Sequence, residues 1–243
     1  MAVWIWWHFI RPRNTSWMEK YAIIVAGGSG SRMGTVLPKQ FLLIHNRPVL
    51  WYTLNAFLKS YQDLQIILVS PAGFSDRISG ICESTGFVER IQWVVGGDTR
   101  FHSVQNGLSL VPGPSMVFIH DAVRCLVSPA LIHRCYEEAL LFGSAVPCID
   151  SRDSVRIIRD KGHEAVKRSD VKLVQTTQTF LSELLLPAYQ TQFREDFTDD
   201  ASVVEANHQP VHLVSGEENN IKITNPLDLV IAGTLLQPPQ DPL

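Results

Sequence analysis

Short apolar runs alternate with longer amphipathic stretches through the first 150 residues, and this alternation constrains the fold more than any other feature. The expected elements are strands at 21–26, 65–70, 91–95, 116–120 and 144–149 and helices at about 49–60, 75–85, 101–111 and 128–143. The runs 66–69 and 116–119 are apolar throughout, which is typical of strands covered on both faces. The order predicts an α/β fold with a mostly parallel sheet flanked by helices.

The rhythm breaks between residues 153 and 175. The segments 154–158 and 171–175 flank a polar turn near Gly162, which predicts a protruding β-hairpin arm over about 153–175. Two strands alone are marginal in water, so the arm must pack against a second subunit or lie on its own domain. Both alternatives stay open. Two helices at about 179–193 and 199–207, a strand at 211–215 and a final helix capped by Asn225 and Pro226 are expected to follow.

The two ends of the chain differ in composition from the rest. Residues 1–17 carry four tryptophans around a short apolar run that is too short to span a bilayer. Their positive charges follow the apolar run, which is the reverse of a signal peptide. We expect 1–17 to be an appendage outside the fold, from an over-long reading frame or, alternatively, a membrane-surface anchor. Residues 18–236 should form a single domain and 237–243 a disordered tail.

Charge and cysteine content narrow the function classes. A net charge of −3 with 45% apolar residues gives no indication of nucleic acid as a partner. The four cysteines lie far apart without a C-x-x-C pair, so neither a zinc site nor a disulfide framework is expected. We therefore expect reduced thiols in a cytoplasmic protein that does not associate with a membrane.

A glycine-rich stretch follows the first predicted strand. Gly28, Gly30 and Gly34 form G-x-G-x-x-x-G, which is one residue longer than the dinucleotide fingerprint, and no G-K-[ST] follows. A nicotinamide-dependent oxidoreductase also needs an acidic residue for the ribose, and 51–60 contains none. A plain tight turn remains an alternative. Because Arg32 and Lys39 stand close to these glycines, we expect a site for a polyphosphate.

Six motifs occur in the order and approximate spacing of one family. They are Val25–Met33 with Pro38–Gln40, Gly96–Arg100 with Ser103 and Val104, His120–Arg124, Gln175–Phe180, Thr198–Ser202 and Asn220–Thr224. Over residues 20–236 the chain resembles the 2-C-methyl-D-erythritol 4-phosphate cytidylyltransferases. The related ribitol-5-phosphate cytidylyltransferases share most of these motifs.

The resemblance implies a Rossmann-like nucleotidyltransferase that works as a homodimer through its hairpin arm. Its reaction would transfer CMP from CTP to 2-C-methyl-D-erythritol 4-phosphate, a sugar-alcohol phosphate, with Mg²⁺ as cofactor. The products would be 4-diphosphocytidyl-2-C-methyl-D-erythritol and pyrophosphate. Ribitol 5-phosphate is the alternative acceptor, and a non-catalytic nucleotide-binding module is the alternative outside this class.

The resemblance also assigns roles to residues. Arg32 and Lys39 match the catalytic pair that stabilises charge on the triphosphate, although Lys39 could be a solvated surface lysine. The nucleotide-binding positions are Ala26, Gly27, Gly28, Gly30, Ser31, Gly97, Asp98, Ser103 and Ala122. For Asp98, a turn or helix cap is the structural alternative. Lys222 and a basic residue of the arm, Arg156 or as fallback Arg152, match the groups that bind the acceptor phosphate.

The residues around Asp121 can be interpreted from chemistry. Asp121 ends an apolar strand, where ligand sites of open α/β sheets gather, so it is a candidate for magnesium or a sugar hydroxyl. Arg124 is a candidate for substrate phosphate, and His120 is expected to be a satisfied core residue. Cys125 and Thr177 stand where the family usually has proline, and the arm is two residues longer than usual. These departures bear on acceptor specificity more than on catalysis.

Overall fold

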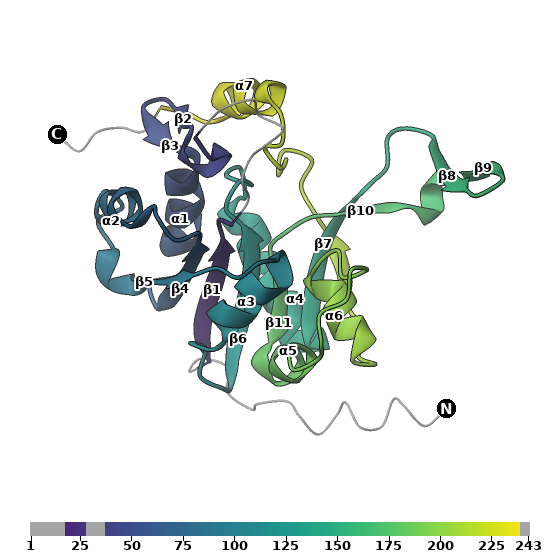
Figure 1. The fold of residues 1–243 in the computed structure, drawn as a ribbon, viewed down its shortest axis with the longest axis horizontal. Coiled ribbons are helices and arrows are strands. Elements are labelled where there is room, and N and C mark those ends of the chain that lie inside the picture. Colours follow the sequence, from purple (N-terminus) through teal and green to yellow (C-terminus); the bar gives the residue numbers. More distant parts are fainter. Residues whose placement is uncertain (1–17, 28–36, 239–243) are drawn as a thin grey trace.

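The computed structural model describes residues 18–27 and 37–238, and within them a twisted sheet forms the centre of the molecule (Figure 1). The strand order is β10-β7-β11-β6-β1-β4-β5. An eighth strand, β12, lies off this order and pairs in parallel with β7. The strands are β1 (Glu19–Val25), β4 (Leu64–Ser70), β5 (Ile91–Val95), β6 (Ser115–Asp121), β7 (Ser144–Asp150), β10 (Lys172–Val174), β11 (Gln178–Leu181) and β12 (Leu213–Ser215). Strands β6, β1, β4 and β5 run parallel, as predicted.

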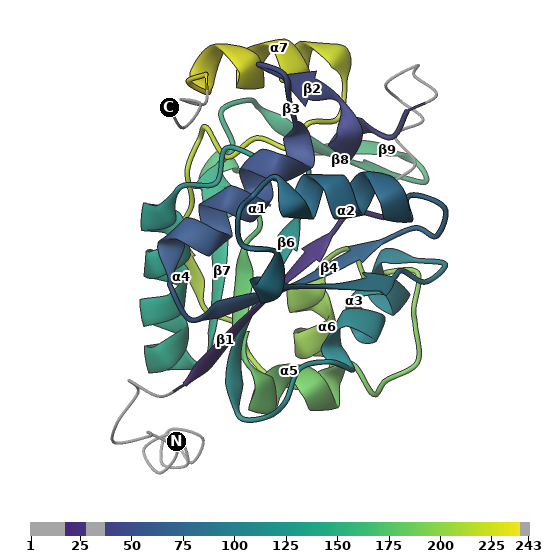
Figure 2. The ribbon, with the colours of Figure 1, turned by 90° about the vertical axis from the view of Figure 1, so that its left-hand side faces the viewer.

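Helices cover both faces of this sheet (Figures 1 and 2). The helices are α1 (Val49–Ser60), α2 (Ser75–Glu83), α3 (Arg100–Leu108), α4 (Pro129–Phe142), α5 (Ser182–Ala188), α6 (Asp200–Ala206) and α7 (Pro226–Leu235). On one face α1, α2 and α4 form a hydrophobic core with Ile24 of β1, and on the other α3, α5 and α6 form a core with Ile23. Alternate residues of one fully buried strand thus feed two cores.

A smaller hydrophobic cluster closes the end of the sheet where the strands finish. The short hairpin β2 (Leu43–Ile44) and β3 (Arg47–Pro48) packs against α7, and Ile44, Val49 and Ile223 are buried between them. His45 in the tight turn of this hairpin has a φ of 46° and bonds through Nε2 to the carbonyl of Gly233 at 2.8 Å. This contact joins the early hairpin to the last helix.

Two expectations about the second half of the chain are wrong in part. The helix expected over 179–193 begins at Ser182, because Thr179 and Phe180 pair with β7 inside the sheet. The hairpin consists of β8 (Val155–Arg159) paired with β9 (Gly162–Val166), whereas Lys172–Val174 pairs with β7 as β10. The segment 171–175 therefore belongs to the sheet and not to the hairpin, which lies away from the sheet in Figure 1.

Some expectations fall on the ends of the chain. The proposed appendage 1–17 and residues 239–243 of the proposed tail lie outside the described residues, while Met18 is buried in the first core. In the described part of the chain, every helix is too short or too polar to cross a bilayer. All four cysteines are buried free thiols.

Candidate functional site

A cavity of about 280 Å³ opens where β1, β5 and β6 end. Ligand sites of open α/β sheets form at this edge, because the carboxyl ends of parallel strands and the turns that follow them meet there. The described residues that line it are Val25, Ala26, Gly27, Lys39, Gln40, Gly97, Asp98, Thr99, Arg100, Ser103, Asp121, Val123 and Lys222. Segments far apart in the sequence therefore share one cavity.

The turn after β1 forms one wall. Gln40 is buried and donates from Nε2 to the carbonyl of Ala26 at 2.6 Å, and the amide of Ala26 donates to Val69 of β4 at 2.7 Å. Lys39 lines the cavity with only 8% of its surface exposed, so it is not a solvated surface lysine. The predicted residues Gly28, Gly30, Ser31 and Arg32 lie outside the described part of the chain.

The loop between β5 and α3 forms a second wall and is held by one hydroxyl group. Ser103 accepts a bond from the amide of Gly97 at 3.1 Å and donates to the carbonyl of Thr99 at 2.9 Å. A Cβ on Gly97 would lie 2.5 Å from Cβ of His102, so this position requires glycine. Asp98 lies in the same loop and lines the cavity. Three predicted nucleotide-binding positions thus belong to one braced turn.

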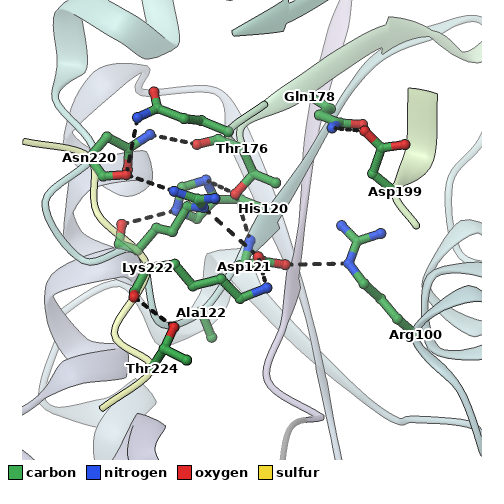
Figure 3. A network of polar contacts seen from close by, with 12 residues as sticks. Arg100, His120, Asp121, Ala122, Thr176, Gln178, Asp199, Asn220, Lys222 and Thr224 are labelled. Carbon is green, nitrogen blue, oxygen red and sulfur yellow. Dashed lines mark hydrogen bonds and ion pairs between the residues drawn. The ribbon is translucent and has the colours of Figure 1, made fainter. Parts of the chain in front are cut away.

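Asp121 is buried at the end of β6 and is surrounded by positive charge (Figure 3). Nζ of Lys222 lies 2.8 Å from its Oδ2, and Nε of Arg100 lies 3.3 Å from its Oδ1. Nε of Arg124 is 3.9 Å from Oδ2. Burial opposes the negative charge, but Arg100, Lys222 and Arg124 outweigh it and hold the carboxyl pKa well below its usual range. Asp121 is therefore a fixed anion in the cavity wall.

His120 is a satisfied core residue, as predicted. Its side chain is fully buried, and burial lowers its pKa to about 4. Because Nε2 faces the carbonyl of Arg124 at 3.1 Å, that nitrogen carries the proton. Nδ1 then accepts from the hydroxyl of Thr176 at 3.2 Å, and the same hydroxyl accepts from the amide of Asp121 at 3.1 Å. The neutral ring thereby helps to fix the end of β6.

Several other predicted residues do not reach the cavity lining in the single chain. Nη1 of Arg124 donates to the carbonyl of Asn220 at 2.7 Å. The amide of Ala122 donates to the carbonyl of Val25, and the carbonyl of Ala122 accepts from the hydroxyl of Thr53.

Both arm candidates are exposed. Nε of Arg156 donates to His163 within the hairpin at 2.9 Å, and Arg152 pairs with Glu218.

Three residues in or beside the site, Arg100, Asp200 and Gln40, have no role in the assignment made from the sequence. Arg100 lines the cavity and touches Asp121, and it forms a bidentate pair with Asp200, at 2.8 and 2.7 Å. Both stand in motifs quoted above, but 100 positions separate them and no local spacing indicates that they meet. Gln40 was also quoted without a role, although a buried amide beside a glycine loop is a recognisable brace.

The fit of Mg²⁺ to this site can be judged from its donor groups. The described residues contain no cluster of three side chains of the metal-ligating kind. Mg²⁺ is commonly held by one or two carboxylates together with substrate phosphates, so one buried carboxylate beside a phosphate site is sufficient. Asp121 meets this requirement, and Asp98 lines the same cavity.

Comparison with known proteins gives a consistent result. A family model described as 2-C-methyl-D-erythritol 4-phosphate cytidylyltransferase matches residues 21–238. A protein of that name from Bacteroides fragilis is 51% identical over 219 residues, which cover 90% of this chain and 100% of that protein. A relative of the same name from Bacteroides thetaiotaomicron is 50% identical over 219 residues, which again cover 90% of this chain and 100% of that protein. The crystal structure of 4-diphosphocytidyl-2C-methyl-D-erythritol synthase from Anaerococcus prevotii has a TM-score of 0.77 and 29% identity, covering 89% of this chain and 97% of that one.

Proposed function

The chain belongs to the 2-C-methyl-D-erythritol 4-phosphate cytidylyltransferase family, and from this premise we propose how its cavity carries out the reaction. The enzyme transfers the cytidylyl group of CTP to 2-C-methyl-D-erythritol 4-phosphate and yields 4-diphosphocytidyl-2-C-methyl-D-erythritol and pyrophosphate. The observation that carries this function is the family match over 90% of the chain at 51% identity. We propose in addition a role for each residue of the site, Mg²⁺ as the cofactor, a homodimer as the assembly and the cytoplasm as the location.

The chemical step is a displacement at phosphorus. A phosphate oxygen of the acceptor attacks the α-phosphorus of CTP, and the bond to the oxygen bridging the α- and β-phosphorus breaks. The electron pair of that bond leaves with pyrophosphate. The acceptor phosphate is already largely ionised near neutral pH, so a general base is not needed. Catalysis then depends on positioning and on stabilising negative charge.

Lys39 and Arg32 supply the positive charge for the triphosphate. Support comes from the cavity, since Lys39 lines it beside the turn that follows β1. Backbone amides of Gly27, Gly28, Gly30 and Ser31 would approach the phosphates closely, while Ala26, whose amide is bound to Val69, would fix the start of this turn. We expect loss of either cation to lower turnover on the order of 10²-fold.

The loop between β5 and α3, braced by Ser103 of α3, recognises the base. Because Ser103 braces the amide of Gly97, the main chain of this loop is fixed before the ligand binds. A fixed carbonyl can accept from the amino group of cytosine, which uracil lacks. Asp98 lies in the same loop and lines the cavity, and Ala122 directly follows the last residue of β6. This arrangement makes base choice depend on the main chain.

Asp121 and Lys222 form the acceptor side, and Arg124, the further candidate for substrate phosphate, would reach it only by leaving the carbonyl of Asn220. The ammonium of Lys222 lies within 2.8 Å of Asp121, and its side chain is 43% exposed, so it can turn toward an incoming phosphate. Asp121 would then accept from a hydroxyl group of the acceptor. It would also be the protein ligand of Mg²⁺. When bound, the ion would neutralise charge on the phosphates.

A homodimer would complete the acceptor side. The hairpin β8–β9 lies away from the sheet (Figure 1), and Ile158 on it is 76% exposed. A two-stranded hairpin with an exposed apolar residue needs a partner surface, and a second copy supplies one. Arg156, or Arg152, would then reach the acceptor phosphate of the other subunit. The buried free thiols agree with a reducing compartment, so we place the enzyme in the cytoplasm.

The function is tested by pyrophosphate release from CTP and Mg²⁺ with each of two acceptors, 2-C-methyl-D-erythritol 4-phosphate and ribitol 5-phosphate. We expect release with the first and little with the second. Release with ribitol 5-phosphate alone would overturn the acceptor, and CTP binding without product at saturating Mg²⁺ would indicate a non-catalytic module. Lys39→Ala should abolish most release while leaving the melting temperature close to that of the wild type.

A further inference from the structure

Arg100 joins two carboxylates that come from different elements. Its Nη1 and Nη2 lie 2.8 and 2.7 Å from the two carboxylate oxygens of Asp200, and its Nε lies 3.3 Å from Oδ1 of Asp121. The guanidinium is planar, so a bidentate pair on one edge fixes the direction in which Nε points. Figure 3 shows this Nε directed at Asp121. The orientation of Arg100 is therefore set by Asp200.

Asp200 is built to hold one charged partner. It is fully buried at the first turn of α6, and besides Arg100 it accepts a bond of 2.6 Å from the hydroxyl of Tyr189. Burial and then the charge of Asp200 raise the pKa of Tyr189 well above its usual value, so the phenol stays a donor. Phe101 stacks on the Tyr189 ring with centroids 4.9 Å apart. These three donors, together with full burial, hold the carboxylate of Asp200 in one position.

The two cations nearest to Asp121 differ in mobility. Lys222 has a flexible, 43% exposed side chain, whereas Arg100 is held on its far edge by Asp200 and is 28% exposed. If Lys222 turns to the acceptor phosphate, Arg100 remains as the cation that faces Oδ1 of Asp121. Without it, a buried carboxylate would lose much of its charge compensation while the acceptor is being bound.

We propose that Asp200 is a positioning residue for acceptor binding, which acts by holding Arg100 against Asp121 while Lys222 engages the acceptor phosphate. Tyr189 supports Asp200 in this task. The proposal rests on the proposed function, in which Asp121 and Lys222 bind the acceptor. It places the residue that tunes the acceptor side on α6, about 80 residues after β6 and outside the cavity lining.

The test is Asp200→Asn, which keeps the size of the side chain and removes its charge. We expect the KM for 2-C-methyl-D-erythritol 4-phosphate to rise by about 10-fold to 100-fold, which corresponds to about 1.4–2.7 kcal/mol and lies in the range of hydrogen bonds to charged groups. The KM for CTP should change less than threefold, within about 0.65 kcal/mol. Asp200→Glu should recover part of the lost activity.

Asp199→Asn is the matched control. Asp199 is the adjacent carboxylate, but it caps α6 through Ser202 and accepts from Gln178 at 2.8 Å (Figure 3). Asparagine also serves as an N-cap, so this variant should keep the acceptor KM of the wild type. If Asp199→Asn and Asp200→Asn change the acceptor KM equally, the proposal is wrong.

A double-mutant cycle tests the route through Arg100. If Asp200 acts only by holding Arg100, adding Asp200→Asn to Arg100→Met should cause no further loss in acceptor kinetics. Additive losses would overturn the proposed route. Equal increases in both KM values together with a lower melting temperature would assign Asp200 a purely structural role. The proposed function fails in a different way, since wild-type protein would then release no pyrophosphate from CTP and this acceptor.

Discussion

Single buried polar atoms affect the stability of the fold. The hydroxyl of Thr177 is buried and has no hydrogen-bond partner among the described residues. We predict that Thr177→Val raises stability by about 1 kcal/mol, because it removes an unsatisfied polar group without changing the volume. For a chain of this size the melting temperature should rise by about 2–4 °C.

The neighbouring Thr176→Val is the control for this prediction. Thr176 accepts from the amide of Asp121 and contacts His120, so its loss should lower the melting temperature. Equal and negative shifts for the two variants would show that Thr177 is hydrogen-bonded in solution, by water for example, and would contradict the prediction.

Gly97 is the residue whose missing side chain allows the β5–α3 loop to close. A methyl group there would lie 2.5 Å from Cβ of His102, so Gly97→Ala must displace the loop that carries Asp98. We predict a loss of about 1–3 kcal/mol in stability and a higher KM for CTP. Thermal unfolding and initial rates at varied CTP measure both.

Gly80→Ala provides the comparison for Gly97→Ala. Gly80 lies exposed within α2, and a Cβ there meets nothing within 4 Å in the described structure. Alanine in a helix interior should add about 0.5–1 kcal/mol of stability, with CTP kinetics unchanged. A Gly97→Ala protein that matched Gly80→Ala in both measurements would show that the loop is not tightly closed.

At the scale of elements, strand β6 links the core to the site through a buried neutral histidine. The pKa of His120 in the folded protein is about 4, against an ordinary value of 6.5. As the pH falls from 6.5 toward 4, the unfolded chain binds a proton at His120 that the folded chain does not bind. The free energy of unfolding is therefore higher at pH 7 than at pH 5. Between pH 7 and pH 5 the contribution of His120 to the free energy of unfolding should fall by about 2 kcal/mol.

Denaturant unfolding of wild type and His120→Gln between pH 5 and 7 measures this contribution. The wild type should lose more stability on acidification than the variant, whatever their absolute stabilities. The lowered pKa of Asp121 acts at lower pH, because its contribution is lost only as pH falls below the ordinary range of a carboxyl group. If the free energy of unfolding changed equally with pH in the two proteins, His120 would bind its proton as readily in the folded protein as in the unfolded chain, which would contradict the prediction.

Elements with a plain hydrophobic pattern could be predicted from the sequence, and those set by pairing could not. The boundaries of α1 and β5 agree with the expectation, since apolar runs and their ends mark them. Strand β11 was taken for the start of a helix, because four residues followed by the leucine-rich run of α5 carry no separate pattern. Strand β10 was assigned to the hairpin because sequence does not reveal that its partner is β7.

The same distinction holds for the candidate site. Lys39, Gly97, Asp98, Ser103, Asp121 and Lys222 were predicted from motifs and share one cavity. The pair Arg100 and Asp200 was not, because a contact between α3 and α6 depends on how two helices pack on one face of the sheet. Local motifs identify residues that line the cavity, whereas contacts between distant helices are set by packing.

For the whole molecule, the hairpin β8–β9 determines the expected assembly. Its strands pair only with each other in the described structure, so packing against a second copy would stabilise it. We predict that Ile158→Asp, at the 76% exposed position, weakens dimers by placing a charge in an apolar interface. Sedimentation over a range of concentrations should show a larger dissociation constant of the dimer for Ile158→Asp than for the wild type. The control Lys161→Ala, in the hairpin turn, should leave this constant unchanged.

A mixed dimer can show whether Arg156 acts in the partner's site. Lys39→Ala and Arg156→Ala proteins should each have little activity, because each lacks a group at every site. If Arg156 crosses to the other subunit, a mixed dimer has one site with both defects and one site with none. Half of the dimers should be mixed after subunit exchange, so activity should return to roughly one quarter of the wild type. If Arg156 served the site of its own subunit, every site in every dimer would lack one group and mixing would restore nothing.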